Sequence, residues 1–154
     1  MREGRAVAID LDGALGDTRP LWDEWISSAS ALLEFDAAKL PTDRAEAAAE
    51  LDRRGAGNWR ALLERFSEER APLYLRRDAG ASAALRSLAA AGREIGVFTD
   101  APEPLARVAL AHLGADRRVA ALETGTGALE RLFATLGEDA LVVVTRADLQ
   151  DAAA

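Results

Sequence analysis

The sequence contains no cysteine, and it has one histidine, His112, and one lysine, Lys39, among its 154 residues. The lack of cysteine excludes disulfide bonds, thiolate metal ligands and a cysteine nucleophile, and it is consistent with a reducing compartment. A mechanism that needs histidine has only His112 to use. The remaining basic residues are all arginine, so a reaction that requires a lysine has a single candidate.

Long apolar runs are also missing. No segment approaches the roughly 18 apolar residues of a membrane span, and nothing resembles a signal peptide, so we expect a cytoplasmic protein. The formal net charge is −7, and an acidic chain binds nucleic acids and anionic membranes poorly. We therefore expect neither as a partner, and the sequence leaves the oligomeric state open.

Hydrophobic residues make up 49% of the chain, which is enough for one compact core. The run at 5–11 predicts a buried strand, and from Pro20 the period becomes helical, with a last helix that we expect Pro72 to end. After Asp78, predicted helices alternate with predicted strands. The expected strands lie at 95–98, 118–122 and 141–144, the helices at 82–91, 104–113 and 126–136, and a short Ala-rich tail follows.

Alternating strands and helices predict parallel strands that are joined by right-handed crossovers. The fold class is therefore predicted to be α/β, with a parallel Rossmann-like sheet of about four strands and an inserted α-helical cap. We expect residues 1–16 and 77–154 to form the core domain and residues 17–76 to form the cap. The aromatic face of the cap, which contains Trp22, Trp25 and Trp59, is expected to form the cap's own core.

Ligands of an open parallel sheet bind beyond the carboxyl ends of its strands. Four pairs of residues lie there: Asp10 with Asp12, Thr99 with Asp100, Glu123 with Thr124, and Thr145 with Arg146. Two carboxylates that lie two residues apart at a strand end can face the same crevice. One can attack phosphorus and the other can act as acid and base, although such residues also cap turns and helices. Two acids that face a phosphate require a cation, usually Mg²⁺.

The string from Ala8 to Thr18, Ala-Ile-Asp-Leu-Asp-Gly-Ala-Leu-Gly-Asp-Thr, resembles the first motif of the haloacid dehalogenase-like (HAD) hydrolases. The similarity is to the phosphatase branch with a helical cap, such as phosphoglycolate phosphatases, and Val97 to Asp100 resembles the second motif. The resemblance implies that Asp10 is the nucleophile and a metal ligand. It implies that Asp12 is the general acid and base, with its carbonyl on the metal, and that Thr99 and Asp100 bind the phosphoryl group.

The later motifs of that family are degenerate in this chain. The third motif supplies a lysine, but Lys39 lies in the expected cap. The fourth motif supplies metal-binding acids after the last strand, where this chain has Thr145 and Arg146, with Asp148 and Asp151 close by. Asp148 is the tentative third metal ligand. Arg146 either binds phosphate in place of the lysine or forms a salt bridge with Asp10 and inactivates it.

The function predicted from the resemblance is hydrolysis of a small phosphorylated metabolite through an aspartyl phosphate on Asp10, with Mg²⁺ as cofactor. The alternative is a catalytically degenerate HAD-like protein that binds a ligand or partner, or that forms an oligomer. Two further details stay open. Gly125 and Gly127 precede a helix and either cradle a phosphate or form a tight turn, and Asp17 and Thr18 either border the substrate or cap a helix. Arg107 and Arg131 are expected to be solvated.

Overall fold

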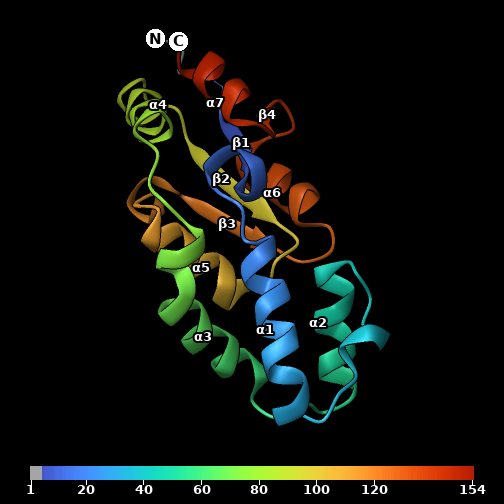
Figure 1. The fold of residues 1–154 in the computed structure, drawn as a ribbon. Helices are drawn as coiled ribbons and strands as arrows, with labels where there is room; N and C mark the ends of the chain where they lie inside the picture. Colours follow the sequence, from blue (N-terminus) through green and yellow to red (C-terminus); the bar gives the residue numbers. More distant parts are fainter. Residues whose placement is uncertain (1–4) are drawn as a thin grey trace.

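The computed structural model describes residues 5–154, so residues 1–4 of the expected core domain lie outside the described residues. Fourteen elements follow one another along these residues, and Figure 1 labels the helices and strands. They are β1 (Val7–Asp10), η1 (Leu11–Leu15), α1 (Arg19–Leu32), η2 (Ala37–Lys39), α2 (Arg44–Arg53), α3 (Trp59–Tyr74), α4 (Ala79–Ala90), β2 (Ile95–Thr99), α5 (Glu103–His112), η3 (Asp116–Arg118), β3 (Ala121–Thr124), α6 (Ala128–Leu136), β4 (Leu141–Val143) and α7 (Arg146–Ala153).

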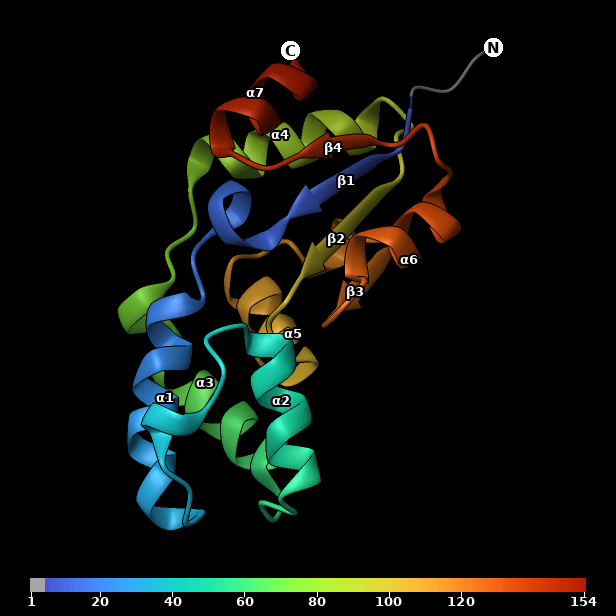
Figure 2. The same ribbon diagram turned by 90° about the vertical axis from the view of Figure 1, so that its right-hand side faces the viewer.

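The four strands form one parallel sheet in the order β3-β2-β1-β4, which confirms the predicted fold class. Ile9 is opposite Val97 in β2 and Val143 in β4, so β1 lies in the centre of the sheet. Because all strands run the same way, their carboxyl ends meet at one edge. The helices α1, α2 and α3 lie beyond that edge (Figure 2). In the described residues, no helix is both long and apolar enough to cross a membrane.

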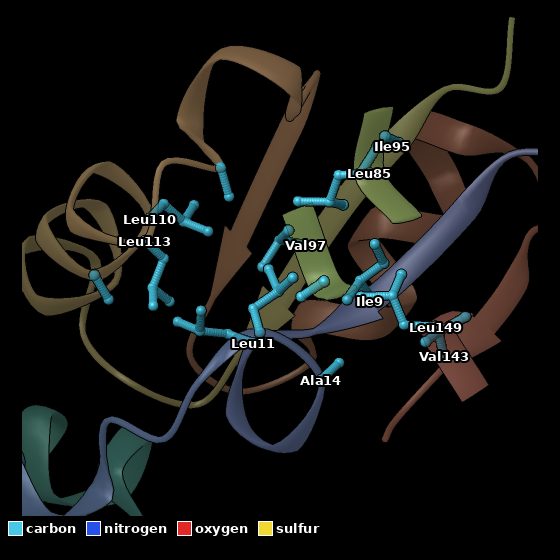
Figure 3. Close-up of a cluster of buried hydrophobic side chains, with 14 of the residues drawn as sticks. Ile9, Leu11, Ala14, Leu85, Ile95, Val97, Leu110, Leu113, Val143 and Leu149 are labelled. Atoms are coloured by element: carbon cyan, nitrogen blue, oxygen red, sulfur yellow. The ribbon is translucent and has the colours of Figure 1, made fainter. Parts of the chain in front are cut away.

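The two faces of the sheet bury different side chains. Val7 and Ile9 belong to a large apolar cluster that α4, α5 and α7 cover, and Figure 3 shows its centre. Ala8 points to the opposite face, where Leu132 of α6 packs against it. This alternation follows from the two-residue period of a strand. A Cβ atom on Gly96 would lie only 2.6 Å from Leu132 Cδ1, so the glycine allows α6 to approach the sheet.

The helical segment between β1 and α4 has an apolar cluster of its own. Trp22 and Trp25 of α1 pack beside Trp59 of α3. The ring centroids of Trp22 and Trp25 are 5.3 Å apart, and those of Trp25 and Trp59 are 6.0 Å apart. Leu105 of α5 belongs to the same cluster. The helical segment is therefore attached to the rest of the protein by apolar contacts as well as by the backbone at its two ends.

Several predicted boundaries were wrong. The third strand is Ala121–Thr124, because the η3 turn (Asp116–Arg118) precedes it and the amide of Val119 still bonds to the Asp116 carbonyl. The helix α3 passes Pro72 and ends two residues later, at Tyr74. The Ala-rich tail is the helix α7, in which Leu149 is fully buried.

Candidate active site

The polar residues that follow β1 and β2 meet at the carboxyl edge of the sheet. Asp10 is the last residue of β1 and is opposite Phe98 in β2, and Thr99 ends β2. After Asp10 the chain makes the wide turn η1, which the amide of Gly16 closes by bonding to the Leu11 carbonyl at 3.1 Å. This turn brings Asp12 back beside Thr99, so the parallel pairing of the two strands creates the site.

Gly13 makes that turn possible. Its φ angle is +104°, and a Cβ atom at this position would lie 2.9 Å from the carbonyl oxygen of Val144. Residues other than glycine rarely adopt such a φ angle, and the backbone after β4 leaves no room for a Cβ atom at this position. The glycine of the Asp-x-Asp-Gly string therefore serves the close approach of two backbone segments.

Asp12 is surrounded by hydrogen-bond donors. Its Oδ1 accepts from the amide and from the hydroxyl of Thr18, both at 2.7 Å. Its Oδ2 accepts from the Thr99 hydroxyl at 3.1 Å and forms a salt bridge with Arg44 Nη2. Only 8% of the Asp12 side chain is exposed. Thr18 precedes α1 but makes no side-chain cap; its hydroxyl donates to Asp12, and its oxygen accepts from Arg44 Nη1.

Arg44, the first residue of α2, is the functional residue that sequence reasoning missed. Its side chain is 4% exposed and reaches the strand ends from the helical segment. Nη2 and Nε donate to Asp100 Oδ1 at 2.7 and 3.2 Å, and Nη1 donates to Thr18 Oγ1 at 2.6 Å. Burial alone would raise the pKa of Asp100, but the hydrogen bonds and charge of Arg44 outweigh this effect and lower it. No local pattern marks Arg44, since its partners lie far away in the sequence.

Asp10 is the carboxylate of this site that Arg44 does not contact. Its Oδ1 accepts one hydrogen bond, from the Asp12 amide at 3.2 Å. Burial and then the negative charge of Asp12 raise the pKa of Asp10 from 3.8 to about 6, against the lowering effect of that hydrogen bond. Asp10 lines a cleft of about 430 Å³ together with Phe98, Thr99 and Asp100. A carboxylate in this setting is ionised at neutral pH but more basic than usual, which suits a nucleophile.

The opposite wall of the cleft combines donors and acids. It contains the loop 125–127 and the first turn of α6, whose amides have no partners within the helix and favour an anion. Asp43, Glu46 and Glu130 line the same cleft, so its rim is negative. A second cleft of about 310 Å³ shares Asp100 and Ala45 with the first and extends along α2 to Arg60.

Arg131 holds the loop before α6 in shape. Its guanidinium donates to the carbonyls of Thr124 and Thr126 and to Glu123 Oε2, the last at 3.0 Å. Gly125 and Gly127 have φ angles of +83° and +72°, as a tight turn requires. Arg131 is 48% exposed, so it is solvated as expected, although it also bonds to this loop. Arg107 is likewise exposed and pairs with Glu103 on its own helix.

The residues after β4 do not join Asp10. Arg146 donates to the carbonyls of Leu15 and Ala14 at 3.1 and 3.4 Å and lies 3.7 Å from Asp78. The salt bridge between Arg146 and Asp10 that the sequence left open is therefore not formed. Asp148 lines a different cleft, of about 400 Å³, beside β4, and its amide donates to the Thr145 hydroxyl, which caps α7.

Other sequence candidates also lie elsewhere. Asp17 is half-exposed and accepts a hydrogen bond from Arg19 Nε at 2.7 Å; that hydrogen bond lowers the pKa of Asp17. His112 Nε2 lies 3.1 Å from the Leu75 carbonyl, and Lys39 belongs to the turn η2 in the helical segment. Neither lines the Asp10 cleft.

A divalent cation fits this set of residues poorly. Mg²⁺ prefers several oxygen ligands in octahedral geometry. Within residues 5–154, no three His, Cys, Asp or Glu side chains are grouped so that they could hold a metal ion. The Asp12 and Asp100 carboxylates are already engaged by Arg44, and Asp148, the tentative third ligand, lies in the separate cleft beside β4.

Comparison with known proteins identifies the fold. No family model and no curated protein matches the chain. Among solved structures, the chain is similar to a candidate β-phosphoglucomutase from Thermotoga maritima, with a TM-score of 0.57 and 17% identity over 97% of this chain and 82% of that one. This likeness supports a Rossmann-like α/β fold. At such low identity it shows the fold alone.

Proposed function

We propose that this protein is a hydrolase that removes the phosphoryl group from a small phosphorylated metabolite through an aspartyl phosphate on Asp10. The observation that carries the proposal is the Asp10 carboxylate, which lines the 430 Å³ cleft at the end of β1 and has a pKa of about 6. Thr99 and Asp100, which line the same cleft, are the proposed phosphate-binding residues.

The proposed reaction has two displacements. A carboxylate oxygen of Asp10 attacks phosphorus, the bond from phosphorus to the leaving oxygen breaks, and Asp12 gives that oxygen a proton. Asp12 then takes a proton from a water molecule, which attacks the aspartyl phosphate and releases inorganic phosphate and free Asp10. The Thr99 hydroxyl and the first amides of α6 are the proposed donors to the phosphoryl oxygens.

The shape and charge of the cleft suggest a substrate class. We propose that residues 17–76 act as a cap over a core of residues 1–16 and 77–154, with α2 forming one wall of the cleft. The carboxylates of Asp43, Glu46 and Glu130 on the rim repel further negative charge. We therefore propose phosphomonoesters whose leaving group is small and carries no second anionic group.

The alternative is a catalytically degenerate protein that binds a ligand or a partner. One observation favours it: Asp12, the proposed acid and base, accepts three hydrogen bonds from Thr18 and Thr99 and pairs with the buried Arg44. In that arrangement its lone pairs are occupied, and it can neither give nor take a proton at the phosphate.

The test is hydrolysis of an aryl phosphate by the wild-type protein and by Asp10→Asn across pH 4.5–9. We expect turnover that disappears in Asp10→Asn and that falls in the wild type as the pH drops through about 6, where Asp10 becomes protonated. Glu130→Gln is the matched control, because this carboxylate lines the same cleft but has no role in the proposed chemistry.

Two results would reject the proposal. Equal turnover in the wild type and Asp10→Asn would mean that Asp10 is not the nucleophile. A complete lack of turnover, together with a melting temperature that rises when inorganic phosphate is added, would favour the ligand-binding alternative, since a ligand of the native state stabilises it by mass action.

A further inference from the structure

Arg44 is a cation that enters the proposed active site from the helical segment. It is almost completely buried, with 4% of its side chain exposed. The guanidinium contacts the turn after β1 through Asp12, the end of β2 through Asp100, and the start of α1 through Thr18. One side chain thus joins three segments that are far apart in sequence.

Arg44 also makes the polar attachment of α2 to the sheet. Its own amide lies 3.4 Å from Asp100 Oδ2, in addition to the side-chain bonds. Within the described part of the chain, the hydrogen bonds and ion pairs from α2 to the strand ends all come from this residue. Elsewhere α2 faces the strand ends across the two clefts, with the small side chains of Ala45, Ala48 and Ala49 on its wall.

The rest of α2 is anchored differently. Ala47 and Leu51 belong to the apolar cluster of the helical segment, and Asp52 pairs with Arg60 of α3 at 2.6 Å. These contacts hold α2 to its neighbouring helices. The same cluster includes Ala101, which follows Asp100, and Leu105 of α5, so apolar contacts position the body of α2, and the Arg44 contacts are the polar ones that hold its first turn at the strand ends.

We infer that Arg44 is an autoinhibitory latch. Its positive charge neutralises Asp12 and Asp100 at the strand ends, and it holds α2 closed over the cleft while it keeps Asp12 from the reaction. The assignment of Asp12 as the inhibited group rests on the proposed function. The latch itself rests on the Arg44 contacts alone. Turnover then requires Arg44 to leave Asp12, which moves the first turn of α2 away from the strand ends.

A second consequence concerns metal binding. Asp12 Oδ2 and Asp100 Oδ1 both contact Arg44 Nη2, so two carboxylates face the same point. With Arg44 present, both are neutralised and Mg²⁺ has little to gain. Without Arg44, the same two carboxylates are uncompensated, and Mg²⁺ is commonly bound through one or two carboxylates and several water molecules.

Hydrogen–deuterium exchange of the full chain tests the latch without reference to turnover. In Arg44→Gln we expect the amides of α2 to exchange at least tenfold faster than in the wild type, while those of β1, β2 and α5 stay unchanged. The control is Arg53→Gln on the last turn of the same helix, where the side chain is 70% exposed. It should leave the exchange of α2 unchanged. Unaltered exchange in Arg44→Gln would overturn the latch.

Asp100→Asn covers the case in which Arg44→Gln destabilises the whole protein. This change weakens the half-exposed side of the latch and keeps the Arg44–Asp12 pair. We expect a smaller increase in exchange that is again confined to α2. An increase spread evenly over the chain in both variants would mean that Arg44 stabilises the fold in general, and the latch would be rejected.

Thermal melting with and without Mg²⁺ tests the second consequence. We expect 10 mM Mg²⁺ to raise the melting temperature of Arg44→Gln by several degrees and to leave the wild type unchanged. An equal rise in both proteins would show that Mg²⁺ and Arg44 do not compete, and no rise in either would show that Arg44 does not stand in for a cation. These outcomes are independent of whether the protein hydrolyses phosphate esters.

Discussion

An arginine lies near aspartates at two places on the carboxyl edge of the sheet, beside β1 and β2 and after β4, but the two arginines differ in burial and in their contacts. At β1 and β2, Arg44 is 4% exposed and binds the carboxylates of Asp12 and Asp100. At β4, Arg146 is 39% exposed, donates to two backbone carbonyls and lies 3.7 Å from Asp78. Charges interact strongly where water is excluded, so the first region can control chemistry, whereas the second supports the backbone.

The largest expected effect is on the buried ion pairs. Removing one partner of a buried pair leaves an uncompensated charge, and we expect Arg44→Gln to lower the free energy of unfolding by about 2–3 kcal/mol, less than for a fully buried pair because Asp100 is half exposed. Urea unfolding at pH 7 measures this loss. A double-mutant cycle with Asp100→Asn should give a coupling energy of about 1 kcal/mol.

The comparison would break if Arg44 proved to be no more important than a surface arginine. A loss below about 0.5 kcal/mol in Arg44→Gln would place it in the range of exposed pairs. The same cycle on Arg146 and Asp78 supplies that reference, because this contact is long and both side chains are more than one-third exposed.

A smaller effect is expected from Asp10, whose pKa of about 6 lies above the usual value of 3.8. The folded protein therefore binds this proton more tightly than the unfolded chain does. The stabilisation from this bound proton is complete below pH 4 and is lost as the pH rises through 6. Asp10→Asn has no such loss, and we expect it to be more stable than the wild type above pH 6 by about 1 kcal/mol, after allowance for solvent screening.

Denaturant unfolding of Asp10→Asn and the wild type at pH 4, 5, 6, 7 and 8 measures this difference. It should grow between pH 4 and pH 6 and then remain constant. A difference that does not depend on pH would mean that Asp10 titrates normally. In that case the region around β1 and β2 would not be the low-dielectric environment that distinguishes it from the end of β4.

The sequence predicted the parts of the site that depend on strand ends. Apolar runs followed by Asp10 and by Thr99 place both residues at the same sheet edge once the strands are parallel, and the hydrogen bond from Thr99 to Asp12 agrees with that expectation. Arg44 could not be predicted in this way. Its partners are 32 and 56 residues away in sequence, and the orientation of α2 is decided by packing that no local pattern encodes.

The end of β4 shows a different limit. The motif comparison assigned Arg146 and Asp148 to the site by their distance from the last strand. The sequence also contains Thr145 three residues before Asp148, which is a typical helix start, and the structure uses it in this way: the Thr145 hydroxyl accepts from the Asp148 amide at 3.1 Å. The local capping signal competed with the family pattern, and it explains why Asp148 lies in the first turn of α7.

The smallest effect is therefore expected from Asp148→Asn. An exposed acid in the first turn of a helix interacts with the helix dipole, and we expect a loss of about 0.3–0.5 kcal/mol that salt screens. More important is its effect on Mg²⁺ binding by Arg44→Gln. Because Asp148 lines the cleft beside β4 and not the Asp10 cleft, adding Asp148→Asn to that variant should leave the Mg²⁺-dependent rise in melting temperature unchanged, while adding Asp12→Asn should abolish it. If Asp148→Asn abolished the rise instead, the two strand-end regions would share one metal site, and their separation into a chemical and a structural region would fail.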